Sequence, residues 1–149
     1  MIKRILASFA MVRGRVPELR MVVVTTPRID PQSLNAPAGV DMRAFVPNLD
    51  RHLAACDLAV VQGGLTTAME LTAARRPFLY FPLAHHFEQN YHVRHRLDHY
   101  RAGRRLDYQA TGPDEIAAAI ATEIGREVDY RPVATDGAAR AASMLASLL

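Results

Sequence analysis

The sequence predicts a single α/β domain with an open, mostly parallel sheet and helices on both of its faces. Short apolar stretches alternate along the chain with helical stretches of about ten residues, which is the pattern of repeated strand–helix–strand units. The chain has 149 residues and 50% of them are hydrophobic, which suits one ordinary domain with a buried core. A Rossmann-like sheet is therefore expected over residues 1–149.

The individual elements follow from hydrophobic spacing and from Gly and Pro stop signals. Ile5, Phe9 and Val12 share one face of a helix that ends before Pro17. Strands are expected at 21–25, 40–46, 58–61, 77–81 and 104–108, and further helices at 48–55, 66–75, 87–101, 113–124 and 137–149. The continuous β-branched run at 21–25 is typical of a parallel strand that is buried on both faces.

The order of the first elements is unusual for this architecture. Doubly wound domains normally begin with a strand, and the loop after that strand supplies the first ligand contacts. Here the expected helix at 2–15 comes first. We therefore expect a first strand to be missing, either cut from a longer chain or supplied by another chain.

Composition excludes several classes of protein. The single Cys56 excludes a disulfide framework and favours a reducing, cytoplasmic setting. No stretch approaches the roughly 18 apolar residues that a membrane span needs. The net charge is +3, but the basic residues include only one lysine and the arginines are dispersed, so nucleic acid is not an expected partner.

Ligands of open α/β sheets bind beyond the carboxyl ends of the strands, which directs attention to the segment after the expected strand at 58–61. Two glycines there allow a ligand to approach the backbone, and the following helix directs free N–H groups and its positive dipole end at the same place. A carboxylate one turn further on suits a ribose diol. The residues are Gln62, Gly63, Gly64, Thr66, Thr67 and Glu70. An ordinary strand-to-helix turn, with Glu70 as a surface residue, is the alternative.

Two further segments lie at expected strand ends. The first, after 77–81, is rich in the directional polar groups that recognise sugar hydroxyls, and its residues are His85, His86, Glu88, Gln89 and Asn90. The second is a loop with Phe45 and Val46 before a proline, where an aromatic ring suits a flat base. A polar helix start and a strand that ends at proline are the corresponding structural alternatives.

The three segments together resemble the donor-binding C-terminal domain of GT-B glycosyltransferases. The resemblance is particularly to UDP-glycosyltransferases and to the related transferase that adds N-acetylglucosamine in peptidoglycan synthesis. Their pattern is His-Gly-Gly, a small polar pair, Glu, two prolines and an acidic-Gln pair. The corresponding residues here are Gln62-Gly63-Gly64, Thr66-Thr67, Glu70, Pro77, Pro82 and Glu88-Gln89, with the family spacing kept up to Pro82. Gln62 replaces the family His, and Gln can donate a hydrogen bond but cannot become cationic.

The resemblance implies a nucleotide-diphosphate sugar, with UDP as its nucleotide, as substrate, and neither a cofactor nor a metal. Gly63, Gly64 and Thr66 would hold the diphosphate and Glu70 the ribose. The sugar would lie against Glu88 and Gln89, and the base against Phe45 and Val46. Backbone N–H groups and the helix dipole would stabilise the departing diphosphate. His86 is a further candidate for contact with phosphate.

The resemblance also implies a partner, because the acceptor site of this family lies in an N-terminal domain. That domain would belong to a longer chain or to a partner subunit, and it would carry any peripheral membrane contact. Exposed apolar surface would then favour self-association. The alternatives are a non-catalytic nucleotide-sugar-binding or interaction module, or a domain similar to sugar-nucleotide epimerases. His92, His95 and His99 follow helical spacing, but a solvated helix face is expected there in preference to a metal site.

Overall fold

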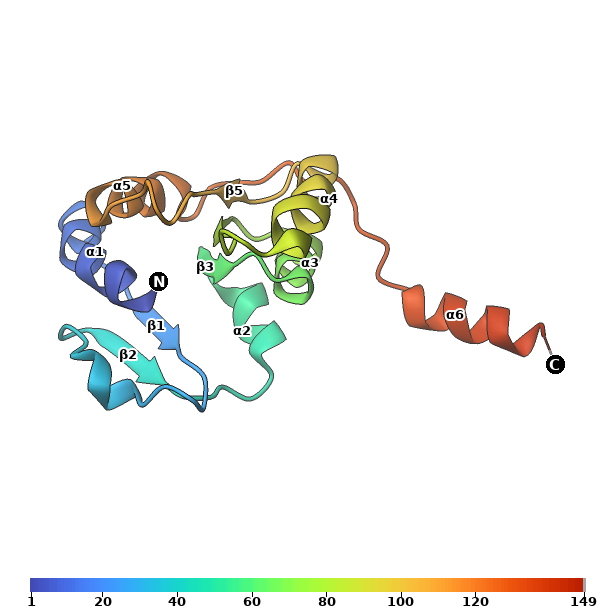
Figure 1. The fold of residues 1–149 in the computed structure, drawn as a ribbon, viewed down its shortest axis with the longest axis horizontal. Coiled ribbons are helices and arrows are strands. Elements are labelled where there is room, and N and C mark those ends of the chain that lie inside the picture. Colours follow the sequence, from blue (N-terminus) through green and yellow to red (C-terminus); the bar gives the residue numbers. More distant parts are fainter. Residues whose placement is uncertain (149) are drawn as a thin grey trace.

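The computed structural model describes residues 1–148, and its helices and strands alternate as the sequence predicts (Figure 1). The strands are β1 (Met21–Val24), β2 (Val40–Arg43), β3 (Ala59–Gln62), β4 (Phe78–Phe81) and β5 (Arg104–Arg105). The α-helices are α1 (Ile2–Arg15), α2 (Leu49–Ala55), α3 (Leu65–Ala73), α4 (Arg94–Tyr100), α5 (Pro113–Glu123) and α6 (Gly137–Ala146). A 3₁₀ turn, η1 (Pro31–Leu34), lies in the loop after β1, and a π-helical segment, η2 (Glu88–Val93), leads into α4.

Every recorded strand pairing is parallel, so the predicted α/β class is confirmed. Hydrogen bonds divide the strands into two sheets instead of one continuous sheet. One sheet has the order β1-β2 and the other has the order β3-β4-β5. Among the described residues no strand pairs with both β1 and β3, so β1 and β3 are edge strands of their sheets.

The core lies on both faces of β4, whose four residues are all buried. On one face, Phe78 and Tyr80 pack with residues of α3 and of the helix that contains η2 and α4. On the other face, Leu79 and Phe81 pack with residues of α1 and α5. The alternation of side chains along a strand produces these two layers, and the apolar run at 78–81 reflects burial on both sides.

The prediction that the strand at 21–25 is buried on both faces is wrong. Its β-branched run forms β1 as expected, but Val22 is 57% exposed and Val23 and Val24 are only partly buried. The physical reason is the division of the sheet, because β1 is an edge strand that lacks the neighbours that cover β4.

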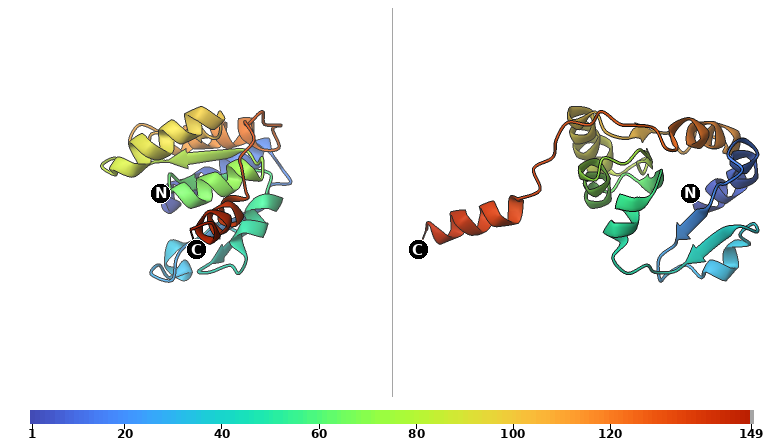
Figure 2. Two further views of the ribbon diagram at one scale, coloured as in Figure 1. Left: turned by 90° about the vertical axis from the view of Figure 1, so that its right-hand side faces the viewer. Right: turned by 180° about the vertical axis from the view of Figure 1, so that it is seen from behind.

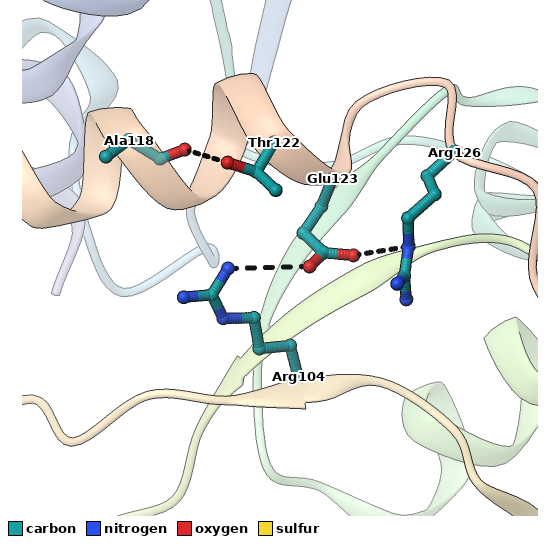
Figure 3. A network of polar contacts seen from close by, with 5 residues as sticks. All are labelled: Arg104, Ala118, Thr122, Glu123 and Arg126. Atoms are coloured by element: carbon teal, nitrogen blue, oxygen red, sulfur yellow. Dashed lines mark hydrogen bonds and ion pairs between the residues drawn. The ribbon is translucent and has the colours of Figure 1, made fainter.

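The segment after α5 ends the packed body of the domain. Glu123, at the end of α5, is buried and pairs with Arg104 of β5 at 3.4 Å and with Arg126 at 2.9 Å (Figure 3). Beyond it, Tyr130 fills a place in the core beside Phe78. The chain then extends to α6, which stands away from the body and has no buried residue (Figures 1 and 2). The predicted last helix is thus present over 137–146, without packing on the sheet.

No helix within residues 1–148 combines the length and the apolar character that a membrane span needs.

Candidate functional site

The turn between β3 and α3 forms the centre of the candidate site. Gly64 precedes α3 with extended backbone, and no side chain caps the helix. The first helical hydrogen bond runs from the Ala68 amide to the Gly64 carbonyl at 3.1 Å. The amide groups of Leu65, Thr66 and Thr67 therefore have no partner within the helix. Together with the helix dipole, they make this end of α3 suited to an anion such as phosphate.

The absence of a side chain at the two glycines of the turn has a different consequence at each position. A Cβ at Gly63 would lie 3.2 Å from the Cα of Pro82 and 3.5 Å from Oε1 of Gln89, so Gly63 allows the β3 turn and the β4 loop to pack together. A Cβ at Gly64 would meet no protein atom within 4 Å. Packing thus explains Gly63, whereas the space at Gly64 is open to a ligand.

The loop after β4 is held by side chains that the sequence assigned to ligand binding. The side-chain oxygen of Gln89 accepts a hydrogen bond from the Leu83 amide at 2.9 Å, and Gln89 is only 8% exposed. The side-chain amide of Asn90 donates to the carbonyls of Leu83 at 2.7 Å and of His86 at 3.0 Å. Gln89 and Asn90 therefore fix the loop that borders Gly63.

The remaining polar residues of the two segments face solvent. Gln62, Thr66, Glu70 and Glu88 are exposed, and Thr67 is half-buried. No side-chain hydrogen bond or ion pair is recorded for Glu70 within residues 1–148. Its carboxylate lies on the second turn of α3, so it is available to a ligand at the amino end of that helix.

Two cavities flank the helix formed by η2 and α4. One, of about 700 Å³, is lined by Leu65 at the start of α3 and by Glu88, and also by His92, His95 and His99. Glu88 is the candidate site residue in this lining, and Leu65 lies between Gly64 and Thr66 in the sequence. The other, of about 660 Å³, is lined by His85 and His86 from the loop and by residues of α4 and β5.

The sequence analysis did not identify three residues that line the cavity of about 660 Å³, namely Phe87, Tyr91 and Arg105. Phe87 and Tyr91 stack with ring centroids 4.7 Å apart although both rings are exposed. Arg105 of β5 reaches the Asn90 side chain at 3.3 Å. The spacing of four between Phe87 and Tyr91 is a signal for such a pair on a helix, but the contact with Arg105 depends on the pairing of β5 with β4.

The third segment lies at the start of α2. Phe45 is 71% exposed, whereas Val46 is 5% exposed and packs inward. The two residues follow β2, which belongs to the other sheet, and α2 packs against α3. Phe45 therefore has an aromatic face free for a ligand, and Val46 anchors its loop.

Within residues 1–148 no group of three or more His, Cys, Asp or Glu side chains is placed to hold a metal ion. His92, His95 and His99 are exposed on the η2–α4 helix, in agreement with the solvated face expected from the sequence. The site offers backbone amides, hydroxyls and carboxylates, which suit the binding of a phosphorylated and hydroxylated ligand.

Comparisons with known proteins identify the family of the chain. The glycosyltransferase family 28 C-terminal domain matches residues 23–144. An uncharacterized glycosyltransferase of Methanosarcina mazei is 30% identical over 115 residues, which cover 76% of this chain and 30% of that protein. The chain thus spans about a third of the length of this curated relative.

Solved structures show the same fold. The glycotransferase of kitacinnamycin superimposes with a TM-score of 0.60 at 24% identity, over 79% of this chain and 30% of that one. The spinosyn forosaminyltransferase SpnP superimposes with a TM-score of 0.54 at 19% identity, over 95% of this chain and 39% of that one. The fold is that of one half of a GT-B glycosyltransferase. The chain therefore belongs to the glycosyltransferase family 28 C-terminal domain family.

Proposed function

We propose that this domain is the donor-binding half of a glycosyltransferase that moves a sugar from a nucleotide diphosphate, with UDP as the nucleotide, to an acceptor hydroxyl. The observation that carries the proposal is the uncapped start of α3 beside Gly64, where a Cβ would meet no protein atom within 4 Å. A free helix start with open backbone beside it suits a diphosphate.

Each residue of the site has a role in this proposal. The amides of Leu65, Thr66 and Thr67 and the Thr66 hydroxyl hold the diphosphate, and the Glu70 carboxylate accepts hydrogen bonds from the ribose. As the bond between sugar and diphosphate breaks, negative charge grows on the leaving oxygen. Fixed N–H dipoles at the start of α3 stabilise that charge more than they stabilise the bound donor, and this difference lowers the barrier.

The loop after β4 positions the transferred sugar in the same proposal. Glu88 lines the larger cavity together with Leu65, and in this proposal its carboxylate accepts hydrogen bonds from sugar hydroxyls near the diphosphate. Gln89 supports the site by holding Leu83, because its oxygen is already engaged. Phe45 supplies a face for the base.

The acceptor and the base that deprotonates it are assigned to another part of the transferase. This chain covers 30% to 39% of the solved chains that share its fold, in agreement with one half of a two-domain enzyme. An acceptor domain, on a longer chain or on a partner subunit, would close the cleft over the donor.

Calorimetric titration with two ligands and two variants tests the proposal. Gly64→Ala is expected to weaken UDP and pyrophosphate binding about tenfold or more, because its methyl group takes the space of the phosphate, a loss of roughly 1.4 kcal/mol or more. Glu70→Gln is expected to weaken UDP binding by about tenfold and to leave pyrophosphate binding unchanged, because it contacts only the ribose. TDP, ADP and GDP measure the preference for the base.

A matched control is Glu127→Gln, which removes an exposed carboxylate outside the site. The proposal fails if UDP does not bind, or if Gly64→Ala, Glu70→Gln and Glu127→Gln bind UDP equally well.

A second candidate, a non-catalytic nucleotide-sugar-binding module, is favoured by one observation. Gln62 occupies the position at the end of β3 where a cationic His would contact phosphate, and its side chain is exposed and uncharged. An assay of the original domain together with its acceptor half separates the two functions, and Gln62→His is the variant that restores a group able to carry a positive charge. A transferase shows transfer before the substitution, whereas a binding module shows donor binding without transfer.

A further inference from the structure

The cavity of about 660 Å³ has no role in the proposed donor site. Its lining comes from the loop after β4, from the η2–α4 helix and from Arg105 of β5, and it includes no residue of the turn between β3 and α3. The donor cavity lies beside the same helix but is lined by Leu65 of α3. The size of the first cavity lies within the range of small-molecule sites, so its chemistry indicates what it could hold.

A pair of exposed aromatic rings borders this cavity. Phe87 and Tyr91 stack with their ring centroids 4.7 Å apart and their planes at 27°, although the two residues are 64% and 65% exposed. The His92 ring meets Phe87 edge-on at 5.3 Å and helps to fix the pair. Neither ring belongs to an apolar cluster of the core within residues 1–148. The pair therefore offers a flat apolar surface on which another ring can stack.

The charged side chains of the cavity favour an anion. Two arginines, Arg94 and Arg105, line it together with one carboxylate, Asp98. Nε of Arg94 lies 3.7 Å from that carboxylate, which is thereby partly neutralised. The rings of His85 and His86 add further hydrogen-bond donors. The net charge of the lining is thus positive even before any histidine is protonated.

The side-chain amide in the lining is already engaged with the protein. The Asn90 amide nitrogen donates to the carbonyls of Leu83 and His86, and its oxygen accepts a hydrogen bond from Arg105 at 3.3 Å. This contact orients the Arg105 guanidinium and uses one of its five N–H groups. A ligand in the cavity therefore meets oriented donors in preference to unoccupied acceptors.

A buried hydroxyl without a recorded partner lies close to the same charged groups. Tyr80 of β4 is 2% exposed, and no hydrogen bond of its hydroxyl is recorded within residues 1–148. Burial raises the pKa of this phenol, Asp98 raises it further, and Arg105 and Arg94 lower it. Its oxygen is therefore near three charged side chains that line the cavity. Buried hydroxyls normally have a partner, which an anion held by the two arginines would supply.

We propose that this cavity is a second ligand site, which binds a small molecule that carries an oxyanion on an aromatic ring. The ring stacks on the pair formed by Phe87 and Tyr91. The oxyanion, a phosphate or a carboxylate, accepts hydrogen bonds from Arg94 and Arg105. The site is separate from the start of α3, so the proposal does not depend on the proposed function.

NMR titration of the ¹⁵N-labelled chain with phenyl phosphate and with benzoate tests the proposal. The two probes share a ring and differ in their anion, so the tighter one identifies the anion that the site prefers. We expect binding in the millimolar range, as is usual for small probes, with the largest shifts at the amides of Phe87, Tyr91 and Arg105. Phenol and inorganic phosphate supply one half of the ligand each and are expected to bind at least about fivefold more weakly.

Four variants assign the binding to the two halves of the cavity. Tyr91→Ala is expected to weaken binding of the tighter probe about threefold or more, whereas Tyr91→Phe keeps the stacking ring and the affinity. Arg94→Gln is expected to weaken binding about tenfold, because it removes a cation and leaves Asp98 unpaired beside the anion. Arg101→Gln is the matched control, since it removes the same charge just after α4 at a residue that lines neither cavity. It is expected to change affinity by less than about twofold.

The proposal would be overturned if neither phenyl phosphate nor benzoate bound, or if their shifts were confined to other residues such as Gly64 and Leu65. Phenol or inorganic phosphate that bound as tightly as the joined probe would also contradict it, and so would equal affinities of Tyr91→Ala, Arg94→Gln and Arg101→Gln. Failure of the proposed function gives a different result, because UDP would then leave Gly64 and Leu65 unshifted while the aromatic probe still shifted Tyr91 and Arg105.

Discussion

Two glycines with left-handed backbone show how much a single residue contributes to this fold. Gly103 has φ +68° and Gly125 has φ +70°. A Cβ at Gly103 would lie 2.3 Å from the buried Phe78 ring, whereas a Cβ at Gly125 would meet nothing within 4 Å. Gly125→Ala is expected to lower the free energy of unfolding by about 1 kcal/mol through backbone strain. Gly103→Ala is expected to cost roughly 3 kcal/mol or more, because the core must also shift.

Urea unfolding of the two variants measures this difference, with each variant compared with the original chain. Equal losses for Gly103→Ala and Gly125→Ala would show that Phe78 moves aside freely.

The single cysteine permits a chemical test at the same scale. Burial raises the pKa of the Cys56 thiol, and its Sγ–H donates to the Leu53 carbonyl at 3.2 Å. A raised pKa means less thiolate at a given pH, so iodoacetamide is expected to alkylate Cys56 several times more slowly in the folded chain than in the urea-unfolded chain at about pH 8. The stability that this thiol contributes is present below its ordinary pKa and falls as the pH rises above it. Equal alkylation rates would contradict the burial of Cys56.

The sequence predicts which residues lie at the candidate site better than it predicts what each side chain does there. A Cβ at Gly64, before α3, would meet no protein atom within 4 Å, and Glu70 is exposed on the second turn of that helix, so both are accessible to a ligand. Gln89 was expected to bind the sugar, yet its oxygen holds Leu83, because only the folded loop brings the two together. Local sequence spacing predicts the helix or strand on which a side chain lies, but it does not predict which backbone group that side chain contacts in the folded chain.

At the scale of elements, hydrophobic spacing was sufficient to find the helices and strands. The strand at 78–81 and the helix α5 agree closely with their expected ranges, because their apolar patterns are long and regular. The π-helical turn η2 was not predicted, since nothing in the local pattern distinguishes it from the α-helix that follows. The division of the sheet was also not predicted, because strand pairing depends on residues far apart in sequence.

The end of α5 carries a prediction about the link between α5 and β5. Glu123 is buried and holds both Arg104 and Arg126, whose side chains are about half exposed (Figure 3). Glu123→Ala is expected to lower the free energy of unfolding by about 1–2 kcal/mol, a modest loss because both arginines remain solvated. Thr122→Ala, at the neighbouring exposed position, is the control and is expected to change it by less than about 0.5 kcal/mol. Thermal unfolding compares the two, and equal effects would exclude a stabilising role for the ion pairs.

At the scale of the whole molecule, α6 is separate from the packed body. None of its residues is buried, whereas Tyr130, just before it, is part of the core. A chain that ends after Ala134 is therefore expected to unfold within about 2 °C of the original. A chain that ends after Asp129 loses Tyr130 and is expected to unfold at least about 5 °C lower. A large loss from the first truncation alone would mean that α6 packs on the body in solution.

The central claim is that the amino end of α3 holds the diphosphate of a nucleotide donor. The most direct measurement is an NMR titration of the ¹⁵N-labelled chain with UDP, followed at each backbone amide. We expect the largest shifts at Gly64, Leu65, Thr66 and Thr67, smaller shifts beside Glu70, and loss of these shifts in Gly64→Ala. Shifts confined to other segments, or shifts at α3 that Gly64→Ala leaves unchanged, would contradict the account.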